Sequence, residues 1–252
     1  MHRLRILVLF IGFFYGGLSL AQEDLSAGRP LMVEVEPTNV IAEKVEGNYQ
    51  LLPYRERRKP WGFTFAVGYS SYEPINYEPN FVTAGFDEVY TSPDVAMVEL
   101  KFSFKRNLPV GSIGAEIGVG IYDNDADVEE FGESSLQLIP IRVGGVYYMD
   151  TLSPEPYIVP YVSGGAYIMV YEETLAGSSF SGNSQVAGYM TGGVAFQLDW
   201  LDKRSARIAY QESEIQSTYV FAEAGTLLES GGATDPDFSS GFNWGAGLRV
   251  EF

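Results

Sequence analysis

Cysteine is absent from the 252-residue sequence, and histidine occurs once, as His2. The lack of cysteine excludes disulfide bonds and thiolate chemistry. Cations are also scarce: 16 Lys and Arg stand against 33 Asp and Glu, which gives a formal net charge of −17. So acidic a chain has no electrostatic surface suited to nucleic acid, and we expect no nucleic-acid partner.

Long apolar runs are missing except at the start of the chain. Two arginines precede an almost unbroken apolar run from Ile6 to Tyr15, and small residues close the segment at Ala21. This pattern is typical of a secretory signal peptide, because the apolar core is short for a membrane-spanning helix. We expect cleavage after residue 21, which removes His2. A retained helical anchor is the alternative. A mature chain that enters a membrane must then do so as closed strands.

Residues 22–60 lack strand alternation and carry scattered acids, so we expect a weakly ordered extension ahead of the folded domain. The extension ends in a basic stretch, Tyr54 to Pro60, which is unusual in an acidic protein. One interpretation is contact with anionic lipid head groups or a phosphate-bearing ligand. The other, somewhat favoured, is a solvated run of charge that flanks the first strand.

The final segment, Phe242 to Phe252, alternates without a break between apolar and polar or small residues. Period-two alternation predicts a half-buried strand, because successive side chains point to opposite faces of the pleat. Aromatic residues stand towards both ends of the apolar face, and Phe252 is the last residue. Aromatic rings favour the two membrane interfaces, so the segment resembles a strand of a transmembrane barrel.

Seven further segments show comparable alternation. We expect strands at 61–72, 94–105, 112–122, 135–148, 156–171, 183–200 and 217–225. In the fifth of these, Tyr157, Tyr161 and Tyr167 are expected to point inward, although Pro160 and a glycine pair leave its phase open. The phase of the seventh is also open. With the final segment the count is eight.

Long and short connections are expected to alternate along the chain. The long ones are a proline-broken loop at 73–93, an acidic loop at 123–134, a polar loop at 172–182 and a Gly- and Asp-rich loop that reaches 237. Short turns follow the second, fourth and sixth strands. Residues 202–209 depart from strand alternation and predict a short helix with Asp202 as its N-cap.

From Trp61 to Phe252 the chain therefore resembles small eight-stranded bacterial outer-membrane proteins of the OmpA, OmpX and OmpW kind. The resemblance implies an all-β fold, an eight-stranded antiparallel transmembrane up-and-down β-barrel with an N-terminal signal peptide and a weakly ordered periplasmic extension. It implies the outer-membrane lipid bilayer as environment. It also implies that the first and the last strand of the barrel both have their free chain ends in the periplasm. It also implies that Phe252 is an assembly signal recognised by the barrel-assembly machinery.

Two sets of strand residues follow from this alternation. The aromatic residues expected on the lipid face are Trp61, Phe63, Phe65, Trp200 and Trp244. The charged residues expected inside the barrel are Glu99, Lys101, Lys105, Glu116, Arg142, Glu223, Arg249 and Glu251. Charges in a narrow lumen should form ion pairs, because an unpaired buried charge is costly. The network either gates an ion path or plugs the lumen, and eight strands favour the plug.

Asp123, Asp125 and Asp127 have the spacing of a calcium-binding loop. The match fails further on, because Val128 stands where the sharp turn needs Gly and Ser134 where a bidentate Glu is expected. We therefore expect a solvated acidic loop and no metal site or cofactor. Loose divalent-cation binding is the alternative.

An enzyme is not expected, because small barrel enzymes rely on an active-site histidine and the mature chain has none. Three functions are weighed instead. The first is a non-enzymatic outer-membrane protein with a structural, envelope-integrity or adhesive surface-contact role, towards a ligand that the sequence does not identify. The second is a channel or transporter for small or hydrophobic molecules. The third, a soluble periplasmic barrel that binds a small ligand, requires the outward apolar faces to be buried elsewhere. Fold resemblance by itself does not decide between them.

Overall fold

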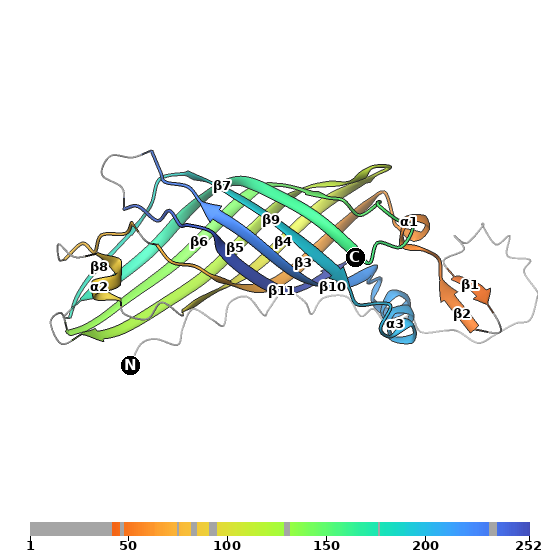
Figure 1. Ribbon diagram of the computed structural model, residues 1–252, viewed down its shortest axis with the longest axis horizontal. Helices are drawn as coiled ribbons and strands as arrows, with labels where there is room; N and C mark the ends of the chain where they lie inside the picture. Colours follow the sequence, from red (N-terminus) through yellow and green to blue (C-terminus); the bar gives the residue numbers. More distant parts are fainter. Residues whose placement is uncertain are drawn as a thin grey trace, which may run out of the picture. The chain divides into compact units, whose positions relative to one another are not determined.

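The computed structural model describes residues 42–45, 48–74, 76–81, 85–90, 95–128, 132–175, 177–231 and 236–252. The expected signal peptide, 1–21, lies outside the described residues. Eight antiparallel strands form a closed barrel (Figure 1). They are β3 (Trp61–Ser71), β4 (Ala96–Leu108), β5 (Gly111–Val128), β6 (Gly132–Tyr148), β7 (Ile158–Leu175), β9 (Ala187–Gln197), β10 (Ser217–Leu227) and β11 (Asn243–Glu251).

Closure of the barrel comes from two pairings. β3 pairs with β11, its partner from the other end of the domain, and β6 pairs with β7. Every barrel strand thus has two hydrogen-bonded neighbours and no free edge remains in the ring. The predicted eight-stranded antiparallel barrel is confirmed.

Side-chain exposure alternates along the strands as the sequence predicts. On β4, Glu99, Lys101 and Ser103 are buried, whereas Leu100 and Phe102 are exposed on the other face. The two uncertain phases are also resolved. On β7, Tyr161 and Tyr167 point inward and are buried, and on β10 Glu223 points inward.

One inward assignment is wrong. Tyr157 is 53% exposed, because it precedes β7 and lies in a turn in which its N–H donates to the carbonyl of Glu155. Strand alternation therefore does not apply to it.

Two connections predicted as loops are largely strand. β5 continues to Val128 and β7 to Leu175, beyond the first residues of β4 and β9, and β8 (Ser178–Asn183) then pairs with β7 alone. The acidic and polar composition of 123–134 and 172–182 was mistaken for loop character. The alternation continues there, but polar side chains replace apolar ones on the outer face.

We call the end of the barrel where β3 begins and β11 ends the proximal end, and the other end the distal end. The prediction that long and short connections alternate regularly is wrong in two places. At the proximal end the connection after β9 is long because it contains α3 (Lys203–Ser213). At the distal end β5 and β6 are separated by residues 129–131 alone, because both strands extend beyond the rim.

The predicted helix after β9 is confirmed. The Asp202 carboxylate accepts hydrogen bonds from the backbone N–H groups of Arg204 and Ser205, both at 3.0 Å, which is the role of an N-cap. α3 ends at Glu214, whose left-handed conformation (φ 56°) closes the last turn.

Four further elements were not predicted. Within residues 22–60, β1 (Ala42–Val45) and β2 (Asn48–Leu51) form an antiparallel hairpin, and α1 (Tyr54–Arg57) follows it. In the connection between β3 and β4, α2 (Phe86–Val89) forms one helical turn. None of the helices in the described part of the chain is long and apolar enough to cross a membrane.

The seam between β3 and β11 depends on close backbone approach at Gly247. A Cβ atom there would lie 2.2 Å from the carbonyl oxygen of Val67 and 2.5 Å from the Cα of Gly68. We expect Gly247→Ala to destabilise the barrel by about 1–3 kcal/mol, the range for overpacking. Urea unfolding in detergent micelles or lipid vesicles measures the change.

Gly192→Ala is the matched control, because a Cβ atom at this strand glycine meets nothing within 4 Å. Equal unfolding midpoints for the two variants would contradict the close approach of β3 and β11.

Candidate functional site

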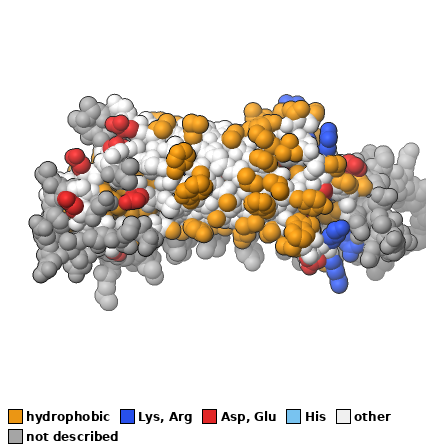
Figure 2. All heavy atoms as spheres, viewed as in Figure 1, with side chains coloured by type: hydrophobic (Ala, Val, Ile, Leu, Met, Phe, Trp, Pro, Cys, Tyr) orange, Lys and Arg blue, Asp and Glu red, His pale blue; other side chains and the backbone are white. Residues whose placement is uncertain are grey.

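The outer face of the barrel carries a broad band of exposed apolar side chains (Figure 2). The distal limit of the band follows one row of the sheet. Ile139 pairs with Val170 inside the band, and the next outward row is Asp123, Gln137 and Glu172. This row crosses three neighbouring strands, so the band ends abruptly and at the same level on each of them.

Aromatic rings concentrate near the proximal limit of the band. Trp61 stacks on Phe104 with ring centroids 5.1 Å apart, and Phe63 stacks on Phe252 at 4.6 Å. The residues expected on the lipid face are exposed or half-exposed: Trp61 51%, Phe63 47%, Phe65 half-buried, Trp200 54% and Trp244 68%. Trp200 lies in the turn after β9 rather than on the strand.

Inside the barrel a charged layer crosses the middle of the lumen. Arg142 on β6 forms an ion pair with Glu99 on β4, and Lys101 forms ion pairs with Glu99 at 3.6 Å and with Glu223 on β10. The hydroxyl of Tyr161 donates to Glu223 at 2.7 Å. These side chains come from four strands, so their charges balance only in the closed barrel.

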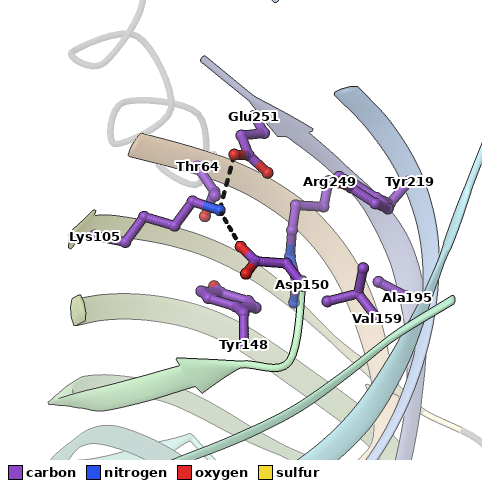
Figure 3. Close-up of a pocket in the computed structure, with 9 residues that line it drawn as sticks. All are labelled: Thr64, Lys105, Tyr148, Asp150, Val159, Ala195, Tyr219, Arg249 and Glu251. Atoms are coloured by element: carbon purple, nitrogen blue, oxygen red, sulfur yellow. Dashed lines mark hydrogen bonds and ion pairs between the residues drawn. The ribbon is translucent and has the colours of Figure 1, made fainter. Parts of the chain in front are cut away.

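A second charged cluster fills the proximal mouth around Lys105. Its ammonium group lies 2.8 Å from Glu251 and 3.2 Å from Asp150, and all three side chains are almost fully buried (Figure 3). The hydroxyl of Tyr54 donates to Glu251 at 2.6 Å and lies 3.1 Å from Asp150. Sequence reasoning missed Asp150 and Tyr54, because neither belongs to an alternating strand.

α1 closes this mouth as a stopper, which we define as residues Tyr54–Arg58. Arg57 donates to the carbonyl of Gln216 at 2.7 Å, and Arg58 pairs with Asp150 at 3.1 Å. Burial and the neighbouring Glu251 carboxylate raise the pKa of the Tyr54 hydroxyl well above its usual range, so the group stays a hydrogen-bond donor.

The basic stretch is therefore neither a lipid-contacting nor a solvated run at Arg57 and Arg58. Both side chains are buried and are held by groups of the barrel. Arg55 and Lys59 do remain exposed, and Lys59 forms an ion pair with Glu214 at the end of α3.

Two predicted network residues have other surroundings. The Arg249 guanidinium lies among three rings, 4.2 Å from the centroid of Tyr161, 4.9 Å from Tyr148 and 5.2 Å from Phe221. Among the described residues, neither Arg249 nor Glu116 has an ion-pair partner within 4.0 Å. Cation–π contacts compensate the buried guanidinium in place of a carboxylate.

The connection between β3 and β4 packs into the distal mouth. Its residues Tyr72, Tyr77, Phe86, Val89 and Tyr90 are buried in one apolar cluster with side chains of β5, β6 and β7. The extension of β5–β7 beyond the rim supplies a wall for this cluster, which includes Leu136 and Met169. We call the described residues of this connection between 72 and 90, namely 72–74, 76–81 and 85–90, the distal stopper.

Glu173 anchors the distal stopper. Its carboxylate is fully buried and accepts from the hydroxyls of Tyr77 at 2.9 Å and Tyr90 at 3.2 Å. It also accepts from Asn80, from the backbone N–H at 3.0 Å and the side-chain amide at 2.8 Å. Segments 72–95, 122–138, 171–186 and 228–242 contain no Lys or Arg, so neutral donors satisfy this carboxylate. Sequence reasoning did not identify Glu173 as a buried residue, because it lies in the segment 172–182, which is predicted as a loop.

The space left in the lumen is small. The two best-defined cavities have volumes of about 10 and 20 Å³. The first is lined by Lys105, Asp150 and Arg249, and the second by Glu99, Arg142 and Glu223. Each has room for about one or two water molecules.

The candidate calcium motif lies on a strand and not on a loop. Asp123 and Asp125 are both exposed on β5, where their side chains follow one face of an extended strand instead of turning around an ion. Among the described residues, no group of three or more His, Asp or Glu side chains is arranged to hold a metal ion.

No protein-family model matches the chain. No curated protein matches its sequence. Among solved structures, the outer membrane protein OprG from Pseudomonas aeruginosa has a TM-score of 0.48 and 12% identity over 77% of this chain and 97% of that chain. Ail, the attachment invasion locus protein of Yersinia pestis, has a TM-score of 0.41 and 12% identity over 76% of this chain and 97% of that chain. Neisserial surface protein A has a TM-score of 0.41 and 12% identity over 77% of this chain and 98% of that chain.

The Glu173 anchor leads to a prediction for the distal stopper. Glu173→Gln weakens the acceptor shared by Tyr77, Tyr90 and Asn80, so we expect the stopper to leave its site more often. A glutamate-specific protease then cleaves the bond between Glu88 and Val89 several-fold faster than in the wild type. Glu172→Gln, the exposed neighbour on β7, is the control and should leave the cleavage rate unchanged.

The contacts of Glu173 also predict how the hydroxyls of Tyr77 and Tyr90 ionise at high pH. Burial, and then the Glu173 carboxylate, raise the pKa of Tyr77 above its usual value near 10, and the pKa of Tyr90 is raised for the same reasons. A raised folded-state pKa contributes stability below pH ~10 that is lost as the pH rises further. Tyrosinate absorbance should therefore show these two hydroxyls ionising later in the wild type than in Glu173→Gln. Identical titrations and cleavage rates would contradict the anchor.

Proposed function

We propose that the chain is a non-enzymatic integral outer-membrane β-barrel protein with a structural and surface-contact role. The observation that carries this proposal is the combination of an apolar outer band with a lumen that is filled along its length and stoppered at both mouths. The band needs a lipid bilayer, because so many large exposed apolar side chains on one continuous surface are incompatible with water. A soluble, ligand-binding periplasmic barrel has no support for the same reason.

The filled lumen supports a structural role over transport. Paired charges in the middle layer, aromatic clusters on either side of it and a stopper at each mouth fill much of the lumen, and the two cavities described above are small. A channel or transporter for small or hydrophobic molecules remains the alternative, and it requires at least one stopper and the middle ion pairs to move aside.

We place the proximal end in the periplasm and the distal end outside the cell. Residues 1–21 are then a cleaved signal peptide, 22–60 a periplasmic extension and 61–252 the barrel. Phe252 is the proposed signal to the barrel-assembly machinery. The β5–β8 extension, with exposed acids such as Asp125 and Glu172 on its outer face, is the proposed contact surface.

Single cysteines test this orientation, because the natural sequence has none. Ser179→Cys lies on exposed β8 at the distal end, and Ser213→Cys lies on exposed α3 at the proximal end. We expect a membrane-impermeant maleimide to label Ser179→Cys on intact cells. Ser213→Cys should react only after the outer membrane is permeabilised. The reverse pattern would invert the barrel, and labelling of both in a soluble fraction would remove it from the membrane.

The middle charged layer tests structural role against transport. Arg142→Met leaves Glu99 with Lys101 as its remaining partner, and breaking a buried pair costs ~3–5 kcal/mol. We expect urea unfolding in vesicles to show this loss. Neither wild type nor variant should give a steady conductance in planar bilayers. Arg106→Met removes an exposed cation on β4 and is the control, with an expected cost of about 0–1 kcal/mol. Unchanged stability with a large change in current would favour transport.

A further inference from the structure

α3 has an unusual surface for a helix of a folded domain. It has eleven residues and a formed N-cap, yet none of its residues is buried. Leu201, which precedes the N-cap, is 63% exposed and Ile208 is 38% exposed. Ala206, Ala209 and Tyr210 are half-buried, so α3 has no fully buried apolar face packed against the barrel.

The charges of α3 are placed against the intrinsic preference of a helix. Lys203 and Arg204 occupy the first turn, where the partial positive charge of the N-terminus disfavours cations, and no acid lies in that turn. Lys203 and Arg204 are consecutive and both exposed, so two like charges are neighbours at this end of the helix. Such an arrangement is stabilised when an anion lies against it.

The position of α3 places this surface at the edge of the apolar band. The helix follows Trp200, 54% exposed, in the turn after β9, whose outward Phe196 belongs to the band. After the helix, the Gln216 N–H donates to the carbonyl of Glu251 at 2.7 Å, and Glu214 pairs with Lys59. Both ends of α3 are thus fixed to the proximal rim.

Exposed cations in the described part of the chain gather at this rim. They include Arg55, Lys59, Arg106, Lys203 and Arg204, whereas the distal segments contain no Lys or Arg. Figure 2 shows the blue side chains at one end of the apolar band and the red ones mainly at the other. Arg106 lies over the ring of Trp61, 5.4 Å from its centroid, so an aromatic ring and a cation also meet there.

We propose that α3, with the preceding Trp200 and Leu201, is an interfacial helix that binds the phosphate groups of anionic phospholipids in the leaflet next to the proximal end. Exposed apolar side chains continuous with the lipid band suit the boundary between head groups and acyl chains. The cations beside them suit a negatively charged lipid surface. The inference rests on the proposed membrane location and adds a lipid preference to it.

The test uses the full chain with Trp61→Phe and Trp244→Phe, which leaves Trp200 as the single tryptophan. The protein is folded into mixed vesicles of phosphatidylcholine and phosphatidylglycerol, with either one or the other lipid brominated at equal mole fraction. We expect brominated phosphatidylglycerol to quench Trp200 fluorescence severalfold more than brominated phosphatidylcholine. High salt should remove the preference.

The double variant Lys203→Gln, Arg204→Gln should quench equally with both lipids. Two controls keep their preference: Lys203→Arg with Arg204→Lys, which retains the charge, and Arg55→Gln, which removes a rim cation outside the helix. Inorganic phosphate at constant ionic strength should not compete. Competition by phosphate would assign the surface to a soluble anion and overturn the lipid inference.

Failure of the two proposals can be told apart. Equal quenching by both lipids in the wild type, or an unchanged preference in the double variant, overturns the inference about α3 while the barrel remains inserted. A variant with Trp61 as its single tryptophan reports insertion, because Trp61 lies on the band. If neither brominated lipid quenches Trp61, the membrane location itself fails.

Discussion

Closure of the sheet is the constraint on which the rest of the structure depends. Because β3 pairs with β11 and β6 with β7, half of the strand side chains point into a lumen that eight strands leave just wide enough for them. Unpaired charges there are costly, so most of the inward charges lie in ion pairs or against aromatic rings. Glu99 is neutralised from two sides by Lys101 and Arg142, and Arg249 is surrounded by rings. The same closure leaves the apolar faces outside, where a bilayer can cover them.

The two stoppers satisfy buried carboxylates in different ways, and the charge distribution along the chain explains why. At the proximal mouth Asp150 forms ion pairs with Lys105 and Arg58, because the cations of the chain gather at that end. The distal segments have no Lys or Arg, so Glu173 is held by tyrosine hydroxyls and an amide. The asymmetry that shapes the lumen thus reappears on the surface, where α3 carries cations and the β5–β8 extension carries acids.

Strand positions were predictable because alternation is local and each barrel strand has one apolar and one polar or small face. The prediction was wrong where the outer face changes from lipid to water. Beyond Ile121 the outward residues are Asp123 and Asp125, while Tyr122 stays buried on the inner face. The two-residue alternation of inward and outward side chains continues, but the outward side chains become polar. A strand with a polar outer face was therefore mistaken for a loop. The stoppers had no such signal, since Tyr54 and Tyr77 lie in segments without alternation.

The sequence by itself determined the eight strands, the face of most strand residues and the charges that point inward, since these follow from the period of two and the chain order. Tertiary structure alone decided which charges meet. Lys105, Asp150 and Glu251 are far apart in the chain and meet because their strands and turn converge on one mouth. It also decided that Arg57 and Arg58 are buried at the proximal mouth, because the energy of a buried ion pair depends on distances that no local pattern encodes.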